Sequence, residues 1–163
     1  MSRLFKFILV LTWLAFPALL LLPQASPGQE KATKKEVLEK LKGGWECVAE
    51  HKDGKLEERS PPYTSRWFFE GEGVFKGRTG ADPNEVTQSG IWTIVEVGEN
   101  SFKMNIDITE GEGKGETYVG IADFSKDRLR WSFRGAKPGG GRPDEFVTKE
   151  GDKVRVYTFQ RIK

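Results

Sequence analysis

Two segments of the chain alternate strictly between apolar and polar residues. One covers residues 102–108, and in the other Leu129, Trp131 and Phe133 are interleaved with arginine and serine. This period of two puts the apolar side chains on one face of an extended strand and is typical of half-buried antiparallel sheets. About eight extended segments with short connections follow residue 43, and no long helices alternate with them. The pattern predicts an all-β barrel or sandwich and argues against a parallel α/β sheet.

Residues 1–28 have the composition of a secretory signal peptide. Arg3 and Lys6 are followed by an apolar run over 7–22, which Pro17 interrupts, and then by small residues. A membrane-spanning helix needs about 20 apolar residues, so a cleaved signal peptide fits better than an uncleaved anchor. We therefore expect an exported protein, periplasmic or extracellular, with no stable membrane span after cleavage.

The charge balance argues against a nucleic-acid partner. The chain has 26 basic and 24 acidic residues, and residues 1–28 contain two of the basic residues and none of the acidic ones. The remaining 24 basic and 24 acidic residues cancel, whereas a domain that neutralises many phosphates carries a basic excess or a basic stripe. We expect no nucleic-acid partner.

Residues 29–42 are expected to form a linker and a short amphipathic helix. Thr33 stands three residues before Glu36, the spacing of a capping box. Val37, Leu38 and Leu41 then recur at helical intervals, and Gly43 is expected to end the helix. The apolar face of this helix is expected to pack on its own domain.

A Gly-Trp pair at the start of the first strand resembles the lipocalins, which are eight-stranded up-and-down barrels. In those barrels the tryptophan closes one end, and a basic residue on the last strand covers its ring. The resemblance implies that Trp45 is the plug and Arg161 the covering cation. A cation over an indole ring contributes about 0.5 to 2 kcal/mol, depending on burial.

A closer resemblance is to a family of small exported domains described as lipocalin-like, which is common in planctomycete bacteria and has no assigned biochemical function. The resemblance covers residues 41–163. We assign residues 43–163 to the barrel domain. The similar segments are 41–45, 53–55, 69–71, 106–111, 114–115, 120–121, Leu129 and 142–146. The resemblance implies the fold. It implies nothing about catalysis, because the family has no known active site whose residues could be carried over.

Cys47 and His51 are the only cysteine and the only histidine. Four residues of strand separate them by about 13 Å, so they do not form a catalytic dyad within a regular strand. A metal site needs more His or Cys ligands than the chain has, so we expect no metal and no cofactor. Cys47 is expected to be a small buried hydrophobe rather than a cross-link between chains, and His51 to be structural or exposed to solvent.

The glycine-rich run 111–115 superficially resembles a phosphate-binding loop. Such a loop needs a terminal Lys-Ser/Thr pair and a following helix, whereas an extended segment follows here, and Glu110, Glu112 and Glu116 would repel a phosphate. We therefore interpret the run as a hairpin loop.

Five carboxylates in or near the family-like segments are candidates for acid–base chemistry, and none of them forms a recognisable catalytic pair. Asp107 falls on the polar face of its strand, where solvent is the expected neighbour. Asp144 and Glu145 follow Arg142 and are expected either to cap a helical turn or to pair with that arginine. The other two carboxylates are Glu110 and Asp123. We expect a protein without enzymatic activity.

The residues expected to face the interior form the most informative set. The candidates for contact with a ligand are Trp67, Phe69, Phe102, Met104, Trp131 and Phe133, with Ile106 and Leu129 on the same faces. A barrel of eight strands either fills with side chains or holds one small ligand. The bulky aromatics favour a mostly filled interior with a small pocket at the end away from Trp45.

Binding of a small apolar or amphipathic ligand in the barrel mouth is the leading functional hypothesis. The alternative is a filled barrel that serves as a protein-interaction or cell-envelope structural module through loops such as 57–65 and 80–89. A more distant alternative is an extracytoplasmic hydrolase.

Overall fold

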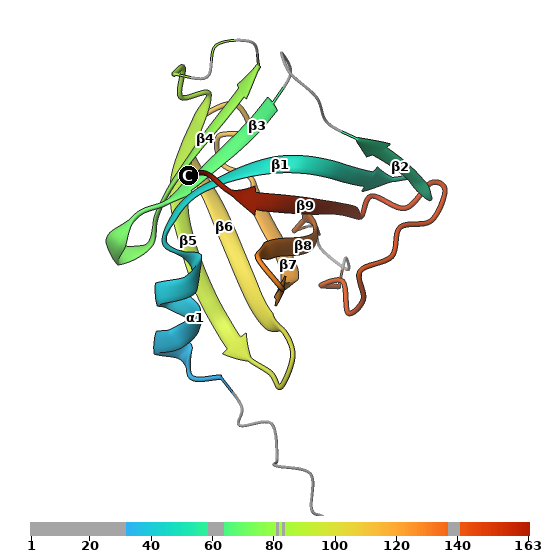
Figure 1. Ribbon diagram of the computed structural model, residues 1–163. Coiled ribbons are helices and arrows are strands. Elements are labelled where there is room, and N and C mark those ends of the chain that lie inside the picture. Colours follow the sequence, from blue (N-terminus) through green and yellow to red (C-terminus); the bar gives the residue numbers. More distant parts are fainter. Residues whose placement is uncertain (1–31, 59–63, 81, 83, 137–140) are drawn as a thin grey trace, which may run out of the picture.

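The computed structural model describes residues 32–58, 64–80, 82, 84–136 and 141–163 (Figure 1). The signal peptide expected over residues 1–28 lies outside this range. Within it, no helix has the length and apolar character needed to cross a membrane.

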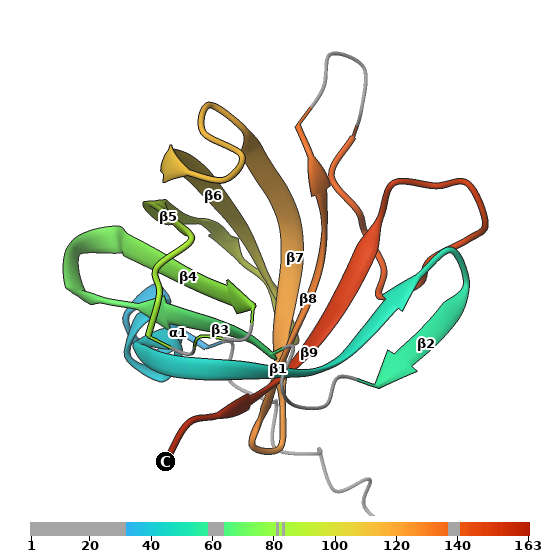
Figure 2. The ribbon, with the colours of Figure 1, turned by 90° about the horizontal axis from the view of Figure 1, so that it is seen from above.

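The strands form one antiparallel meander that closes into a barrel of eight strands, with β2 as an addition (Figures 1 and 2). The elements are α1 (Lys34–Leu41), β1 (Gly43–Lys52), β2 (Lys55–Glu58), β3 (Thr64–Phe69), the 3₁₀ turn η1 (Gly71–Gly73), β4 (Val74–Gly80), β5 (Gln88–Val97), β6 (Phe102–Gly111), β7 (Thr117–Ser125), β8 (Arg128–Gly135) and β9 (Arg155–Arg161). The antiparallel barrel predicted from the sequence is therefore confirmed.

Strand β1 closes the barrel because it has different neighbours along its length. Its first residues pair with β3, with Trp45 opposite Trp67, while its last residues pair with β2. Its other edge pairs with β9 from Trp45–Arg161 to Lys52–Arg155. The first and last barrel strands are neighbours, as expected. A loop was expected from residue 57, whereas residues 57 and 58 belong to strand β2. This strand stands away from the barrel (Figure 2).

The expected helix is present as α1, with the predicted capping box. The Thr33 backbone N–H donates to Glu36 Oε2 at 2.7 Å, and the Glu36 backbone N–H donates to Thr33 Oγ1 at 3.3 Å. Val37 and Leu41 are buried, and the helix lies beside β5 (Figure 1). The helix ends at Leu41 rather than at Gly43, which instead opens β1 with a φ of 105°.

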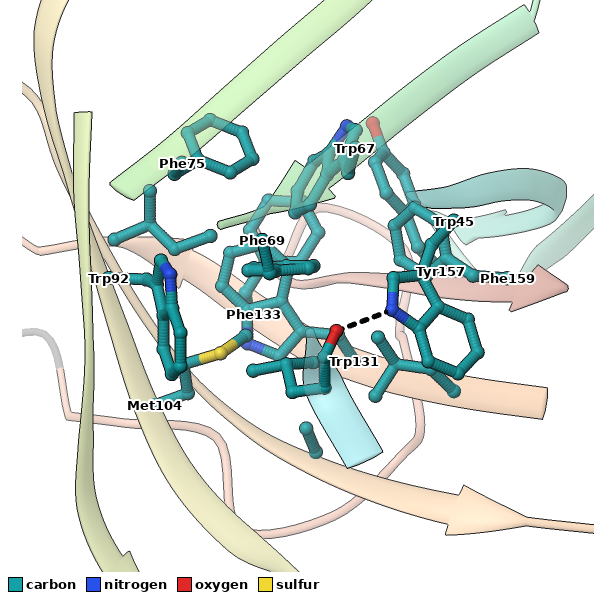
Figure 3. Packing of buried hydrophobic residues seen from close by; sticks show 14 of the residues in the cluster. Trp45, Trp67, Phe69, Phe75, Trp92, Met104, Trp131, Phe133, Tyr157 and Phe159 are labelled. Carbon is teal, nitrogen blue, oxygen red and sulfur yellow. Dashed lines mark hydrogen bonds between the residues drawn. The ribbon is translucent and has the colours of Figure 1, made fainter. Parts of the chain in front are cut away.

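Aromatic side chains fill the barrel interior. The Trp67 ring is central, with ring centroids of Trp131 at 4.9 Å, Phe159 at 5.0 Å and Phe75 at 5.2 Å (Figure 3). Phe69, Met104 and Trp131 are at most 1% exposed. The interior is mostly filled, as the number of bulky residues indicated, because close-packed rings leave little empty volume.

A bulge in β1 reverses the direction of its side chains. The register with β9 shifts between Cys47 and Ala49, so that Trp45 and Cys47 point inward before the bulge and Glu50 points inward after it. Glu50 is 2% exposed, and its Oε1 lies 3.5 Å from Arg155 Nη1. The bulge therefore places a carboxylate inside the barrel, next to the start of β9.

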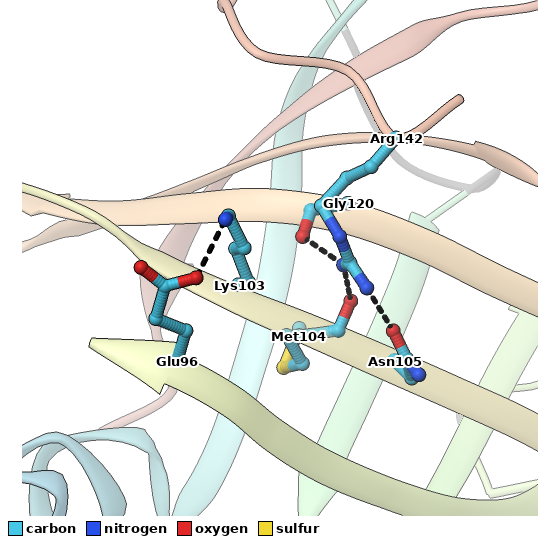
Figure 4. Close-up of polar contacts among 6 residues, drawn as sticks. All are labelled: Glu96, Lys103, Met104, Asn105, Gly120 and Arg142. Atoms are coloured by element: carbon cyan, nitrogen blue, oxygen red, sulfur yellow. Dashed lines mark hydrogen bonds and ion pairs between the residues drawn. The ribbon is translucent and has the colours of Figure 1, made fainter. Parts of the chain in front are cut away.

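The segment before β9 is anchored to the outside of the barrel by Arg142. Its Nη1 donates to Met104 O at 2.8 Å and to Gly120 O at 2.6 Å, and its Nη2 donates to Asn105 Oδ1 at 2.6 Å (Figure 4). The ion pair between Glu96 and Lys103 lies beside these contacts on the same face (Figure 4). Arg142 thus links three backbone or amide oxygens of β6 and β7 to the segment that leads into β9.

Candidate functional site

A pocket of about 450 Å³ opens at the end of the barrel away from Trp45. Its residues come from strands β3, β4, β5, β7, β8 and β9, from the β6–β7 turn and from the segment just before β9. They are Ser65, Trp67, Thr79, Gln88, Glu112, Glu116, Tyr118, Phe133, Arg134, Gly135, Lys153, Arg155 and Tyr157. We call this pocket the mouth pocket; its volume lies within the range of small-molecule sites.

The floor of the mouth pocket is the upper surface of the aromatic core. Trp67, Phe133 and Tyr157 point inward from β3, β8 and β9, and each is at most 9% exposed. The Phe133 and Tyr157 ring centroids are 5.0 Å apart, and the Trp67 and Tyr157 centroids are 5.7 Å apart. Because these rings are held by their neighbours in the core, the floor is a rigid apolar surface.

One wall of the mouth pocket is acidic. Glu112 and Glu116 come from the turn between β6 and β7, and the Tyr118 hydroxyl donates to Glu116 Oε2 at 2.6 Å. Burial, followed by the bond to Glu116, raises the pKa of Tyr118 to about 12. The neutral Tyr118 hydroxyl orients the Glu116 carboxylate through this hydrogen bond.

The adjoining wall is basic. Arg134 comes from β8, Lys153 from the segment before β9, and Arg155 is the first residue of β9. The Arg155 side chain is 45% exposed and is paired on its inner side with the buried Glu50. Arg134 Nε is buried and has no hydrogen-bond partner among the described residues. Arg155 thus lines the pocket and also forms an ion pair with the buried Glu50 carboxylate.

Two of the six sequence candidates for ligand contact line the mouth pocket. These are Trp67 and Phe133. Phe69, Phe102, Met104 and Trp131 are buried elsewhere in the core. The alternation correctly placed all six inside the barrel, but it does not distinguish a ring that faces an opening from one that is covered on all sides.

The closed end has the arrangement that the Gly-Trp pair implied. Trp45 is 3% exposed, its Nε1 donates to Leu41 O at 2.8 Å, and the Arg161 guanidinium lies 4.3 Å from its ring centroid. Arg161 also donates to the carbonyl oxygens of Lys42, at 2.7 Å, and of Lys40. These contacts connect β9, β1 and the end of α1.

The residues considered for catalysis do not come together. Cys47 is buried, and its Sγ lies 3.4 Å from Ala49 O, whereas His51 is exposed. His51 does not line the mouth pocket. The run 111–115 is the turn between β6 and β7, as predicted. In the described part of the chain, no three His, Cys, Asp or Glu side chains are grouped so as to hold a metal ion.

The carboxylates after Arg142 do not pair with it. The Arg142 guanidinium instead bonds to oxygens of β6 and β7. Residues 145 and 146 form a bend, and no helical turn is present in 143–147. Both expectations for Asp144 and Glu145 were therefore wrong, because the arginine is drawn to backbone carbonyls on the barrel surface. Asp107 is exposed, as expected, and its Oδ1 accepts from Thr117 Oγ1 at 2.5 Å.

Sequence reasoning missed the polar residues of the mouth pocket. Glu116, Tyr118 and Arg155 each lie at or just before the start of a strand, where a period of two is too short to establish the direction of a side chain. Glu50 was missed because the bulge that turns it inward has no marker in the sequence. One signal was available in the sequence: Glu116, Tyr118 and Arg155 lie next to predicted turns, and turns are at the ends of a barrel, where a pocket can open.

A scan against models of known protein families finds no match, and searches among curated proteins and among solved structures return no significant match.

Proposed function

We propose that the protein binds a small amphipathic molecule in the mouth pocket. The observation that supports this proposal is the combination of a rigid aromatic floor, made by Trp67, Phe133 and Tyr157, with polar walls in one open pocket of about 450 Å³. Apolar burial on the floor supplies affinity at about 25 cal/mol per Å². The polar groups of the walls orient the ligand.

The filled core limits how deep the ligand goes. Because Trp131, Phe69 and Met104 occupy the interior, the ligand rests on the floor and does not enter the barrel. The same filling favours the alternative, a module that recognises proteins through its surface. Export remains part of the proposal, supported by the signal-peptide pattern of residues 1–28.

The test uses the neutral fluorescent probe N-phenyl-1-naphthylamine and a variant that fills the pocket. Thr79 lines the pocket at the end of β4, outside the aromatic core. Thr79→Trp should weaken probe binding roughly tenfold or more, because the indole occupies the space above the floor. Fluorescence titration measures the dissociation constant.

The matched control is Thr93→Trp, which adds the same side chain on the outer face of β5, where Thr93 is exposed. It should leave the dissociation constant unchanged. Probe binding that is absent from the wild-type protein, or that survives Thr79→Trp at full strength, would contradict the proposal and favour surface recognition.

A further inference from the structure

The mouth pocket carries opposite charges on adjoining walls. The acidic wall holds Glu112 and Glu116 beside β7, and the basic wall holds Arg134, Lys153 and Arg155 on β8 and before and in β9. Strands β7 and β8 are neighbours, with Tyr118 opposite Gly135. The two sets of charges therefore border one pocket while remaining on separate strands.

The two walls do not neutralise each other. Among residues in the described ranges, no ion pair joins Glu112 or Glu116 to a cation of the basic wall, and Arg155 pairs instead with Glu50, inside the barrel. Glu116 accepts from the Tyr118 hydroxyl, which is a neutral donor and not an opposite charge. The pocket thus presents both an anionic and a cationic group to whatever occupies it.

We propose that the ligand is a small zwitterion with an apolar side chain, such as a free amino acid or a dipeptide. This inference rests on the proposed function of the mouth pocket. Its ammonium group faces Glu112 and Glu116, and its carboxylate faces Lys153 and the outer side of Arg155. Its side chain rests on Trp67, Phe133 and Tyr157. This orientation pairs each ligand charge with the opposite wall and covers the aromatic floor.

The geometry disfavours ligands with a single charge. An anion gains from the basic wall but lies beside Glu116, and a cation gains from the acidic wall but lies beside Arg155. A zwitterion satisfies both walls. Because charge-assisted hydrogen bonds are stronger than neutral ones, the preference should be roughly tenfold over either single-charge analogue.

Three compounds that share a phenyl ring and a two-carbon chain test the proposal. They are L-phenylalanine, 3-phenylpropionate and phenethylamine, each used to displace N-phenyl-1-naphthylamine and each measured directly by calorimetry. L-Phenylalanine should bind roughly tenfold more tightly than the other two. Equal affinities, or tighter binding of a singly charged compound, would overturn the inference.

Two variants assign the walls. Glu116→Gln should weaken binding of L-phenylalanine and phenethylamine severalfold and leave 3-phenylpropionate unchanged. Lys153→Met should weaken L-phenylalanine and 3-phenylpropionate and leave phenethylamine unchanged. Glu145→Gln and Lys149→Met remove the same charges from exposed positions outside the pocket and should change nothing.

The outcomes separate this inference from the proposed function. If the neutral probe binds and Thr79→Trp removes it, but the three compounds do not differ, the mouth pocket is a binding site and the zwitterion class is wrong. If calorimetry detects no binding of L-phenylalanine, the inference fails whatever the probe does.

Discussion

Arg161 makes several contacts at one point of the closed end. Its guanidinium covers the Trp45 ring and donates to the Lys42 and Lys40 carbonyl oxygens. Gly43 makes this approach possible, because a Cβ at that position would lie 2.9 Å from Arg161 Nη1. The Gly-Gly-Trp sequence and the terminal arginine are thus parts of one arrangement.

Removing the Arg161 side chain should destabilise the protein. Arg161→Ala eliminates the cation–π contact and two charge-assisted hydrogen bonds, and we expect the free energy of unfolding to fall by roughly 1 to 2 kcal/mol, since the residue is partly screened by solvent. Chemical denaturation measures the change. Arg128→Ala, at an exposed position of β8, is the control and should change stability by less than about 0.5 kcal/mol.

Tyr118 should titrate later than an ordinary tyrosine. An unfolded tyrosine has a pKa near 10, while burial and Glu116 raise the pKa of Tyr118 to about 12. Because the folded state favours the neutral phenol, this contribution to stability is complete below about pH 10 and is lost as pH rises to about 12. Absorbance at 295 nm should show a step near pH 12 that Tyr118→Phe removes. A step that disappears near pH 10 instead would contradict this prediction.

At the scale of elements, β1 has the most varied role. It pairs with β3 near Trp45, with β2 near Lys52 and with β9 from Trp45 to Lys52. The two flanking strands differ in importance, because β9 closes the barrel whereas all four residues of β2 are exposed.

Proline substitutions should reveal this difference. Thr158 pairs with both Ala49 and Arg130, so Thr158→Pro interrupts the centre of β9 and should lower the free energy of unfolding by more than about 3 kcal/mol or prevent folding. Leu56→Pro in β2 should cost less than about 1 kcal/mol, because β2 buries little. Denaturation followed by far-UV circular dichroism compares the two. Equal losses would mean that β2 is part of the stable barrel.

The elements also show how far the sequence can be interpreted. Alternation in 102–108 and 129–134 correctly identified β6 and β8, and the Thr33–Glu36 spacing identified the start of α1. Turns and bulges were harder, because a single extra residue in β1 changes which side chains face inward without altering composition. Two rings of the floor, Trp67 and Phe133, could be predicted because they alternate with polar residues. Tyr157 and the walls were missed, and the walls depend on strand ends.

The whole molecule is held together by aromatic rings, and each of the eight barrel strands contributes at least one. At the closed end, the Phe124 ring centroid lies 6.1 Å from that of Trp45 and 5.3 Å from that of Phe102. The second group is centred on Trp67 and reaches Trp92 through Phe69 and Tyr118 through Phe133. No barrel strand can separate without exposing rings to water.

Unfolding of the described domain should therefore be a single cooperative transition. Near-UV circular dichroism reports the packing of the rings and far-UV circular dichroism reports the strands, and the two should have the same midpoint in denaturant. A loss of the near-UV signal before the far-UV signal would show that the sheet survives without its packed core, contrary to this prediction.

A closed barrel has no edge strand with which another chain could pair, but β2 adds one edge strand to this sheet. Beyond its pairing with β1, β2 occupies the end of the sheet order, where unsatisfied amides invite a second molecule to extend the sheet. Lys55, Glu57 and Glu58 make three of its four positions charged. Charged side chains on an edge strand protect it against pairing with another chain, because a strand added there would have to remove water from them.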